Sequence, residues 1–133
     1  MTGVAEIEGD SSFESVDRFA MIRPRYHETI MALQLRPNCE YCDKDLPPDA
    51  TEARICSFEC TFCADCVESR LHNVCPNCGG GFVPRPIRPL REWRPGVSAV
   101  KHPPSAKRVH LSFSLDDIAA HSARIRDIPP EER

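Results

Sequence analysis

The sequence has little with which to build a large hydrophobic core or to cross a membrane. Aromatic residues make up 7% of its 133 positions, the mean hydropathy is −0.40, and there are only six glycines. No apolar run approaches the roughly 20 residues that a membrane-spanning helix needs. The first 19 residues lack both a basic start and an apolar stretch, so a secretory signal peptide is not expected. These absences predict a cytoplasmic protein that does not contact membranes.

The chain also lacks an overall excess of positive charge. It has 17 Lys and Arg residues against 20 Asp and Glu residues, a net charge of −3, which argues against a polycation for nucleic acid. The charge is unevenly distributed, because residues 37–81 are strongly acidic and residues 84–110 are basic and rich in proline. The length leaves room for one small domain with extensions.

What the chain does have is eight cysteines, all between Cys39 and Cys78. Most come in pairs separated by two residues, a spacing that forms a tight turn and brings two sulfurs to one metal ion. A disulfide framework would need an oxidising compartment, which the missing signal peptide argues against. Eight cysteines complete two four-thiolate sites with none left over, so we predict two Zn²⁺ ions per chain.

Zinc would also offset the scarcity of apolar side chains in this segment. A block of about 45 residues is at the size where a hydrophobic core alone rarely suffices for folding. Structural zinc contributes on the order of 10–16 kcal/mol of apparent folding free energy in zinc-finger peptides. Metal binding is therefore predicted to be a condition of folding.

Local patterns predict a few short elements around the cysteines. Val67 and Leu71 lie four apart, which predicts a short helix over 64–71, and the alternation around Ile55 predicts a strand over 53–58. Ser114 begins a capping-box motif for a C-terminal helix that ends before Pro129. The predicted fold class is a small α+β zinc-binding module with a short hairpin and a short helix, flanked by poorly ordered arms and the C-terminal helix.

The predicted organisation has four segments. They are a polar and disordered extension over 1–30, a two-zinc module over 31–83, a basic Pro-rich linker over 84–110, and a short amphipathic helix with a tail over 111–133.

Spacing alone leaves the division of the cysteines between two metal ions open. A sequential scheme has one site of Cys39, Cys42, Cys56 and Cys60 and another of Cys63, Cys66, Cys75 and Cys78. An interleaved scheme has site 1 of Cys39, Cys42, Cys63 and Cys66 and site 2 of Cys56, Cys60, Cys75 and Cys78. His72 is a further candidate ligand, although the simpler interpretation is a polar residue on the loop after the helix.

The order of the cysteines resembles the cross-brace pattern of RING-like and treble-clef-like zinc domains, with Cys60 where RING domains often have histidine. Phe62, Leu71 and Pro76 also stand where RING domains carry such residues. This resemblance implies the interleaved scheme. It does not by itself imply a function, because one fold hosts many functions.

RING ubiquitin ligases dock a conjugating enzyme through an apolar residue after the first cysteine and a basic residue after the last one. In this chain Glu40 and Gly79 take those places, and only Pro76 keeps the pattern. Ligase-type activity is therefore the last-ranked hypothesis.

A closer resemblance extends over roughly residues 33–89, including NCEYCDKD, CPNCGGGFVPRPIRP and all eight cysteines. This segment resembles a bacterial family of small cysteine-rich proteins catalogued as domain of unknown function 1272. The resemblance implies a bacterial, cytoplasmic, zinc-binding protein and brings no known activity with it.

Two functional hypotheses remain ahead of the ligase. The first is a non-catalytic zinc module for protein interaction or regulation, since two complete sets of four cysteines leave no open position for catalysis. The second is a module associated with nucleic acid through the basic segment, by phosphate contacts and aromatic stacking. The residues that would make those contacts are Arg85, Arg88, Arg91, Trp93 and Arg94.

Overall fold

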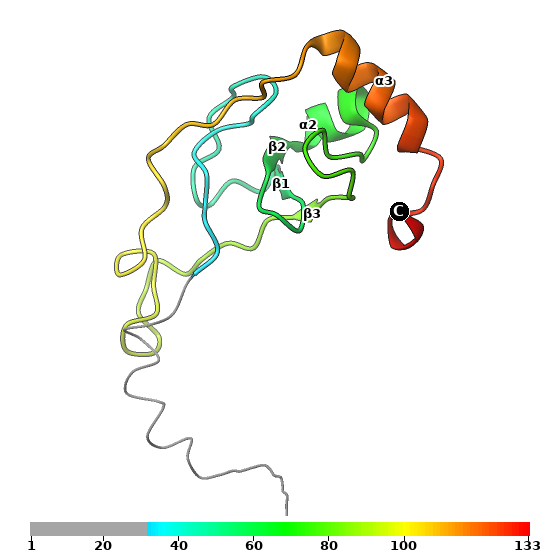
Figure 1. The fold of residues 1–133 in the computed structure, drawn as a ribbon. Coiled ribbons are helices and arrows are strands. Elements are labelled where there is room, and N and C mark those ends of the chain that lie inside the picture. Colours follow the sequence, from blue (N-terminus) through cyan, green and yellow to red (C-terminus); the bar gives the residue numbers. More distant parts are fainter. Residues whose placement is uncertain (1–31) are drawn as a thin grey trace, which may run out of the picture. The chain divides into compact units, whose positions relative to one another are not determined.

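The computed structural model describes residues 32–133, so the predicted polar extension over 1–30 lies outside the described residues. Residues 33–91 and 98–133 form one compact unit, and segment 92–97 belongs to another. The first unit contains a three-stranded antiparallel sheet in the order β2-β1-β3 (Figure 1). The strands are β1 (Ala53–Ile55), β2 (Thr61–Cys63) and β3 (Val83–Pro84).

The predicted hairpin is formed by β1 and β2, in the register that pairs Ala53 with Cys63. The predicted strand over 53–58 ends early, at Ile55, because Cys56 begins a turn. In that turn the Cys56 N–H donates to the Cys60 carbonyl at 3.2 Å, and Glu59 has a left-handed φ of 67°.

The predicted helix over 64–71 is present in two parts. A single turn, α2 (Ala64–Cys66), follows β2 directly and continues as the π-helical η1 (Val67–Leu71). Val67 and Leu71 are both buried, as their spacing predicts. The helix ends at His72 and Asn73, whose φ values of 50° and 60° turn the chain back toward the next cysteine pair.

The core is small and consists largely of cysteine. Six of the eight cysteines are buried, and Cys42 and Cys78 are exposed. The largest fully buried side chain is Phe62 on β2, whose ring meets that of Phe82 edge-on at 5.3 Å between centroids.

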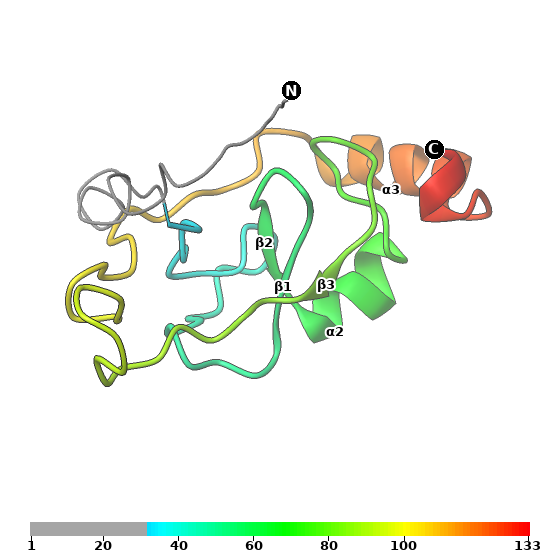
Figure 2. The same cartoon turned by 90° about the horizontal axis from the view of Figure 1, so that it is seen from below.

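The C-terminal helix α3 (Leu115–Ile125) begins as its sequence predicts, with the Ser114 hydroxyl accepting from the Asp117 N–H at 3.1 Å. Only part of α3 is buried against the module. Ile118 and Ser122 are buried, whereas Leu115 at the start of the helix is exposed. The Ser122 hydroxyl donates to the Leu71 carbonyl at 2.7 Å, which places α3 beside η1 (Figures 1 and 2). A short 3-10 turn, η2 (Pro130–Glu132), follows. No helix within residues 32–133 has the length and apolar character needed to cross a bilayer.

Candidate metal centres

The first cysteine group consists of Cys39, Cys42, Cys63 and Cys66, whose sulfurs all lie within 4.8 Å of one another. Two members lie in the loop before the sheet, one ends β2 and one ends α2. The sulfurs of Cys42 and Cys63 are 3.8 Å apart. A tetrahedron with metal–sulfur bonds of about 2.3 Å has edges of about 3.8 Å, whereas a disulfide bond is about 2.05 Å long. The group therefore has the spacing of a metal site, and all its cysteines are free.

The second cysteine group consists of Cys56, Cys75 and Cys78, again with all sulfurs within 4.8 Å. Cys60 lies beside this group and contacts Cys75. The sulfurs that lie together are thus those of the interleaved scheme, with Cys60 adjacent to its three predicted companions. Neither group includes His72. Which of these residues bind metal stays a prediction.

The loops 39–44 and 75–80 have the same backbone hydrogen bonds, although one supplies the first group and the other the second. In each loop the N–H of the first cysteine donates to the carbonyl five residues on, at 2.8 Å. The N–H four residues on donates back to the carbonyl of that cysteine, also at 2.8 Å. This turn requires a left-handed residue after the second cysteine, which is Asp43 (φ 67°) in one loop and Gly79 (φ 81°) in the other.

Backbone N–H groups point at several of the sulfurs. Such contacts stabilise the thiolate form that a metal ion requires. The donors are Cys42 N to Cys39 Sγ at 3.5 Å, Phe58 N to Cys56 Sγ at 3.3 Å and Gly80 N to Cys78 Sγ at 3.4 Å.

Burial opposes ionisation of these thiols when no metal is bound. It raises the pKa of Cys39 and Cys66, and it raises the pKa of Cys56 to about 11. Cys60 differs, because its contact with the Cys75 thiol lowers the pKa of Cys60 to about 5, while the same contact raises the pKa of Cys75. A metal ion replaces the proton on each thiol that it binds. Metal binding at these groups is therefore expected to release protons.

The residue at the first RING docking position faces inward. Glu40 is 3% exposed, and its carboxylate accepts hydrogen bonds from the Thr61 N–H at 2.7 Å and from Arg36 at 2.6 Å. The Glu40 carboxylate is therefore bound within the protein.

The basic segment is divided between two environments. Arg85 is buried, and its guanidinium donates to the carbonyls of Arg36, Leu46 and Pro47 at 2.8, 3.2 and 2.9 Å. Arg88 donates to the carbonyls of His102 and Leu33. The other three residues proposed to contact nucleic acid, Arg91, Trp93 and Arg94, are exposed.

We expect Arg85→Lys to lower the free energy of unfolding by about 2 kcal/mol or more, because hydrogen bonds from a charged group contribute about 1.5–3 kcal/mol each. A lysine ammonium cannot reproduce the planar fork that reaches three carbonyls. Urea unfolding of the metal-loaded protein measures the effect, with the exposed Arg94→Lys as the matched control. Equal stability of the two variants would show that Arg85 does not hold the basic segment on the module.

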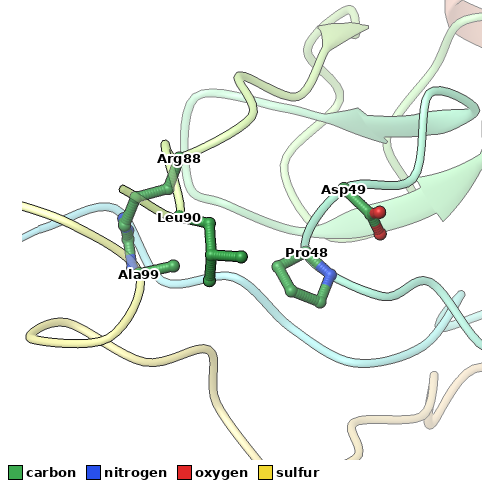
Figure 3. Close-up of a pocket in the computed structure, with 5 residues that line it drawn as sticks. All are labelled: Pro48, Asp49, Arg88, Leu90 and Ala99. Atoms are coloured by element: carbon green, nitrogen blue, oxygen red, sulfur yellow. The ribbon is translucent and has the colours of Figure 1, made fainter. Parts of the chain in front are cut away.

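A separate pocket of about 220 Å³ is lined by Pro48, Asp49, Arg88, Leu90 and Ala99 (Figure 3). No cysteine contributes to this lining, and its one guanidinium is already bound to protein carbonyls. The pocket therefore adds no ligand to either cysteine group.

The comparisons with known proteins agree with the cysteine-rich pattern. Residues 32–88 match the model of a family described as "Protein of unknown function (DUF1272)". The curated Uncharacterized protein R02474 of Rhizobium meliloti (strain 1021) is 56% identical over 77 residues, which cover 58% of this chain and 84% of the relative. No solved structure matches the chain.

Proposed function

The chain belongs to the DUF1272 family, and we propose that it is a non-catalytic zinc protein whose rigid module serves protein interaction or regulation. The observation that carries the proposal is the first cysteine group, in which four sulfurs lie within 4.8 Å of one another. Its 3.8 Å separation between Cys42 and Cys63 fits the edge of a tetrahedral thiolate site.

The donor set favours zinc over the hard cations. Thiolates are soft ligands, and a complete tetrahedral set of four suits Zn²⁺, whereas Mg²⁺ and Ca²⁺ prefer oxygen ligands. At the second group, Cys60 would supply the fourth thiolate beside Cys56, Cys75 and Cys78. Bound zinc would supply folding free energy, and the chain's own residues would supply the turns and N–H groups that position the sulfurs.

A full set of cysteines also argues for a structural role. A catalytic zinc site keeps one position open for water or substrate, and four thiolates close it. Function would then depend on the surface that the metals hold in place. Three large apolar side chains near the sheet are more than half exposed and support a role in protein contacts: Phe58 at 70%, Val83 at 59% and Ile87 at 51%.

Zinc analysis combined with affinity capture tests the proposal. We expect two Zn²⁺ per chain after gel filtration, and a specific protein partner that the zinc-loaded wild type retains from native lysate. Phe58→Ser should lose that partner while keeping both metal ions, because its side chain lies outside both cysteine groups. Fewer than two zinc ions would contradict the metal assignment, and recovery of chaperones alone would contradict the interaction role.

Nucleic-acid binding is the second candidate, favoured by the exposure of Trp93 and Arg94. Against it, the guanidinium groups of Arg85 and Arg88 are already bound to protein carbonyls. A gel-shift titration at low and moderate salt separates the two candidates. No retardation at micromolar protein would remove the nucleic-acid hypothesis.

A further inference from the structure

A buried carboxylate connects the two cysteine groups. Glu40 lies between Cys39 and Cys42 in the sequence, and its side chain is 2% exposed. Burying a carboxylate costs free energy unless the charge is paired and hydrogen-bonded. The cysteines would bind metal through their sulfurs and need no carboxylate at this position. The role of Glu40 must therefore be sought in the residues that its carboxylate contacts.

One carboxylate oxygen of Glu40 holds the segment that links the two groups. Oε2 accepts from Arg36 Nη1 at 2.6 Å and from the Thr61 N–H at 2.7 Å. Thr61 stands between Cys60 and Cys63, and its carbonyl accepts from the Glu40 N–H at 2.9 Å. Glu40 is thus bound, through both backbone and side chain, to the residue between the two predicted sites.

The other oxygen of Glu40 faces the second site. Oε1 accepts from Asn77 Nδ2 at 3.5 Å, and the same nitrogen lies 3.4 Å from the sulfur of Cys60. Asn77 stands between Cys75 and Cys78, the two cysteines of the second CxxC loop. Its amide has two N–H groups, so it can donate to the carboxylate and to the sulfur at the same time.

We propose that Glu40 is a positioning residue that couples metal binding at the two cysteine groups, acting through Asn77 on Cys60. Metal at the first group fixes the 39–44 loop and with it the Glu40 carboxylate. The carboxylate orients the Asn77 amide, whose N–H stabilises the Cys60 thiolate toward the second metal ion, and this hydrogen bond outweighs the repulsion between the Glu40 charge and that thiolate. By linkage, the second metal ion strengthens binding of the first by the same factor.

This inference rests on the proposed function, because both groups must bind metal for coupling to exist. The test uses full-length protein loaded with ¹¹³Cd²⁺ as the probe, since each site gives its own NMR signal. Chelator titration then gives a separate Cd²⁺ affinity for each site. Cys78→Ser, which removes a member of the second group, assigns the signals.

We expect Glu40→Gln to weaken Cd²⁺ binding at the second site by about 10–100-fold, the usual cost of losing a partner of a metal ligand. Asn77→Ala should produce a similar loss. Both substitutions act on Cys60 along one path. The double variant should therefore bind Cd²⁺ at the second site as tightly as the more affected single variant. Glu68→Gln, an exposed carboxylate on η1, is the matched control and should leave both signals unchanged.

The outcomes separate coupling from a general loss of folding. Asn77 is exposed, so Asn77→Ala tests the path to Cys60 while the Glu40 carboxylate keeps its bonds to Arg36 and Thr61. Coupling is overturned if Asn77→Ala leaves the second site unchanged, if Glu40→Gln weakens the first site even when Cys78→Ser has disabled the second, or if the two substitutions are additive. A wild-type protein that binds no Cd²⁺ would instead overturn the proposed function itself.

Discussion

Replacement of Cys39 by Ser is expected to unfold the module. Cys39 is completely buried in the first cysteine group. Structural zinc contributes on the order of 10–16 kcal/mol of apparent folding free energy, whereas a whole small domain is stable by about 5–15 kcal/mol. A site that loses one of its four thiolates forfeits enough of that contribution to exceed the stability of so small a core.

The measurement combines zinc content with amide NMR spectra at neutral pH. The variant should contain one zinc ion or none, and its spectrum should lose the dispersed signals of the wild type. A chelator should likewise remove zinc and the dispersed signals from the wild type. Acid should have the same two effects, because protons compete with the metal ion for the thiolates. Ser57→Ala, an exposed change beside Cys56, is the matched control. Retention of two zinc ions and wild-type stability by the Cys39 variant would contradict the metal-dependent fold.

Replacement of Phe62 by Ala is expected to have the largest effect among the residues outside the two cysteine groups. Phe62 is completely buried on β2, next to Cys63, and its ring packs edge-on against the ring of Phe82. Truncating a buried phenylalanine costs about 3–5 kcal/mol through lost burial and the remaining cavity. The aromatic pair adds about 0.5–1.5 kcal/mol beyond its buried area.

Denaturant unfolding of the zinc-loaded protein measures this loss. We expect a lower midpoint for Phe62→Ala, and release of zinc at a lower chelator concentration, because β2 positions Cys63 in the first group. Phe58→Ala is the matched control, since that ring is 70% exposed and its loss should change stability by less than about 0.5 kcal/mol. Equal midpoints for the two variants would show that the metal ions alone stabilise the module.

Features that depend on neighbours in the sequence were predictable. The cap at Ser114, the helical spacing of Val67 and Leu71, and the hairpin strand that includes Ile55 are local signals, and all three are present. The early end of β1 was missed because the turn after Cys56 needs a left-handed residue. That residue is Glu59, a type that seldom adopts this conformation.

Contacts between distant segments carried no such signal. The Asn38 side chain pairs with the backbone of Val109, donating to its carbonyl at 2.9 Å and accepting from its N–H at 3.2 Å. Arg108 binds both Asp43 and Asp45. Together these bonds hold part of the predicted basic linker against the acidic segment 38–45. Asn, Asp and Arg are equally common on solvent-exposed loops. The sequence therefore does not show whether these side chains bind a distant segment or water.

The sequence by itself determined that this chain carries two sets of thiols able to bind metal, and which short elements lie around them. It could do so because CxxC spacing, capping and helical periodicity act over a few residues. Only the tertiary structure decided that the sulfurs gather in interleaved groups, that Arg85 is buried, and that Glu40 turns inward to Asn77. Those outcomes depend on which distant carbonyls, amides and sulfurs the folded chain brings within hydrogen-bonding distance.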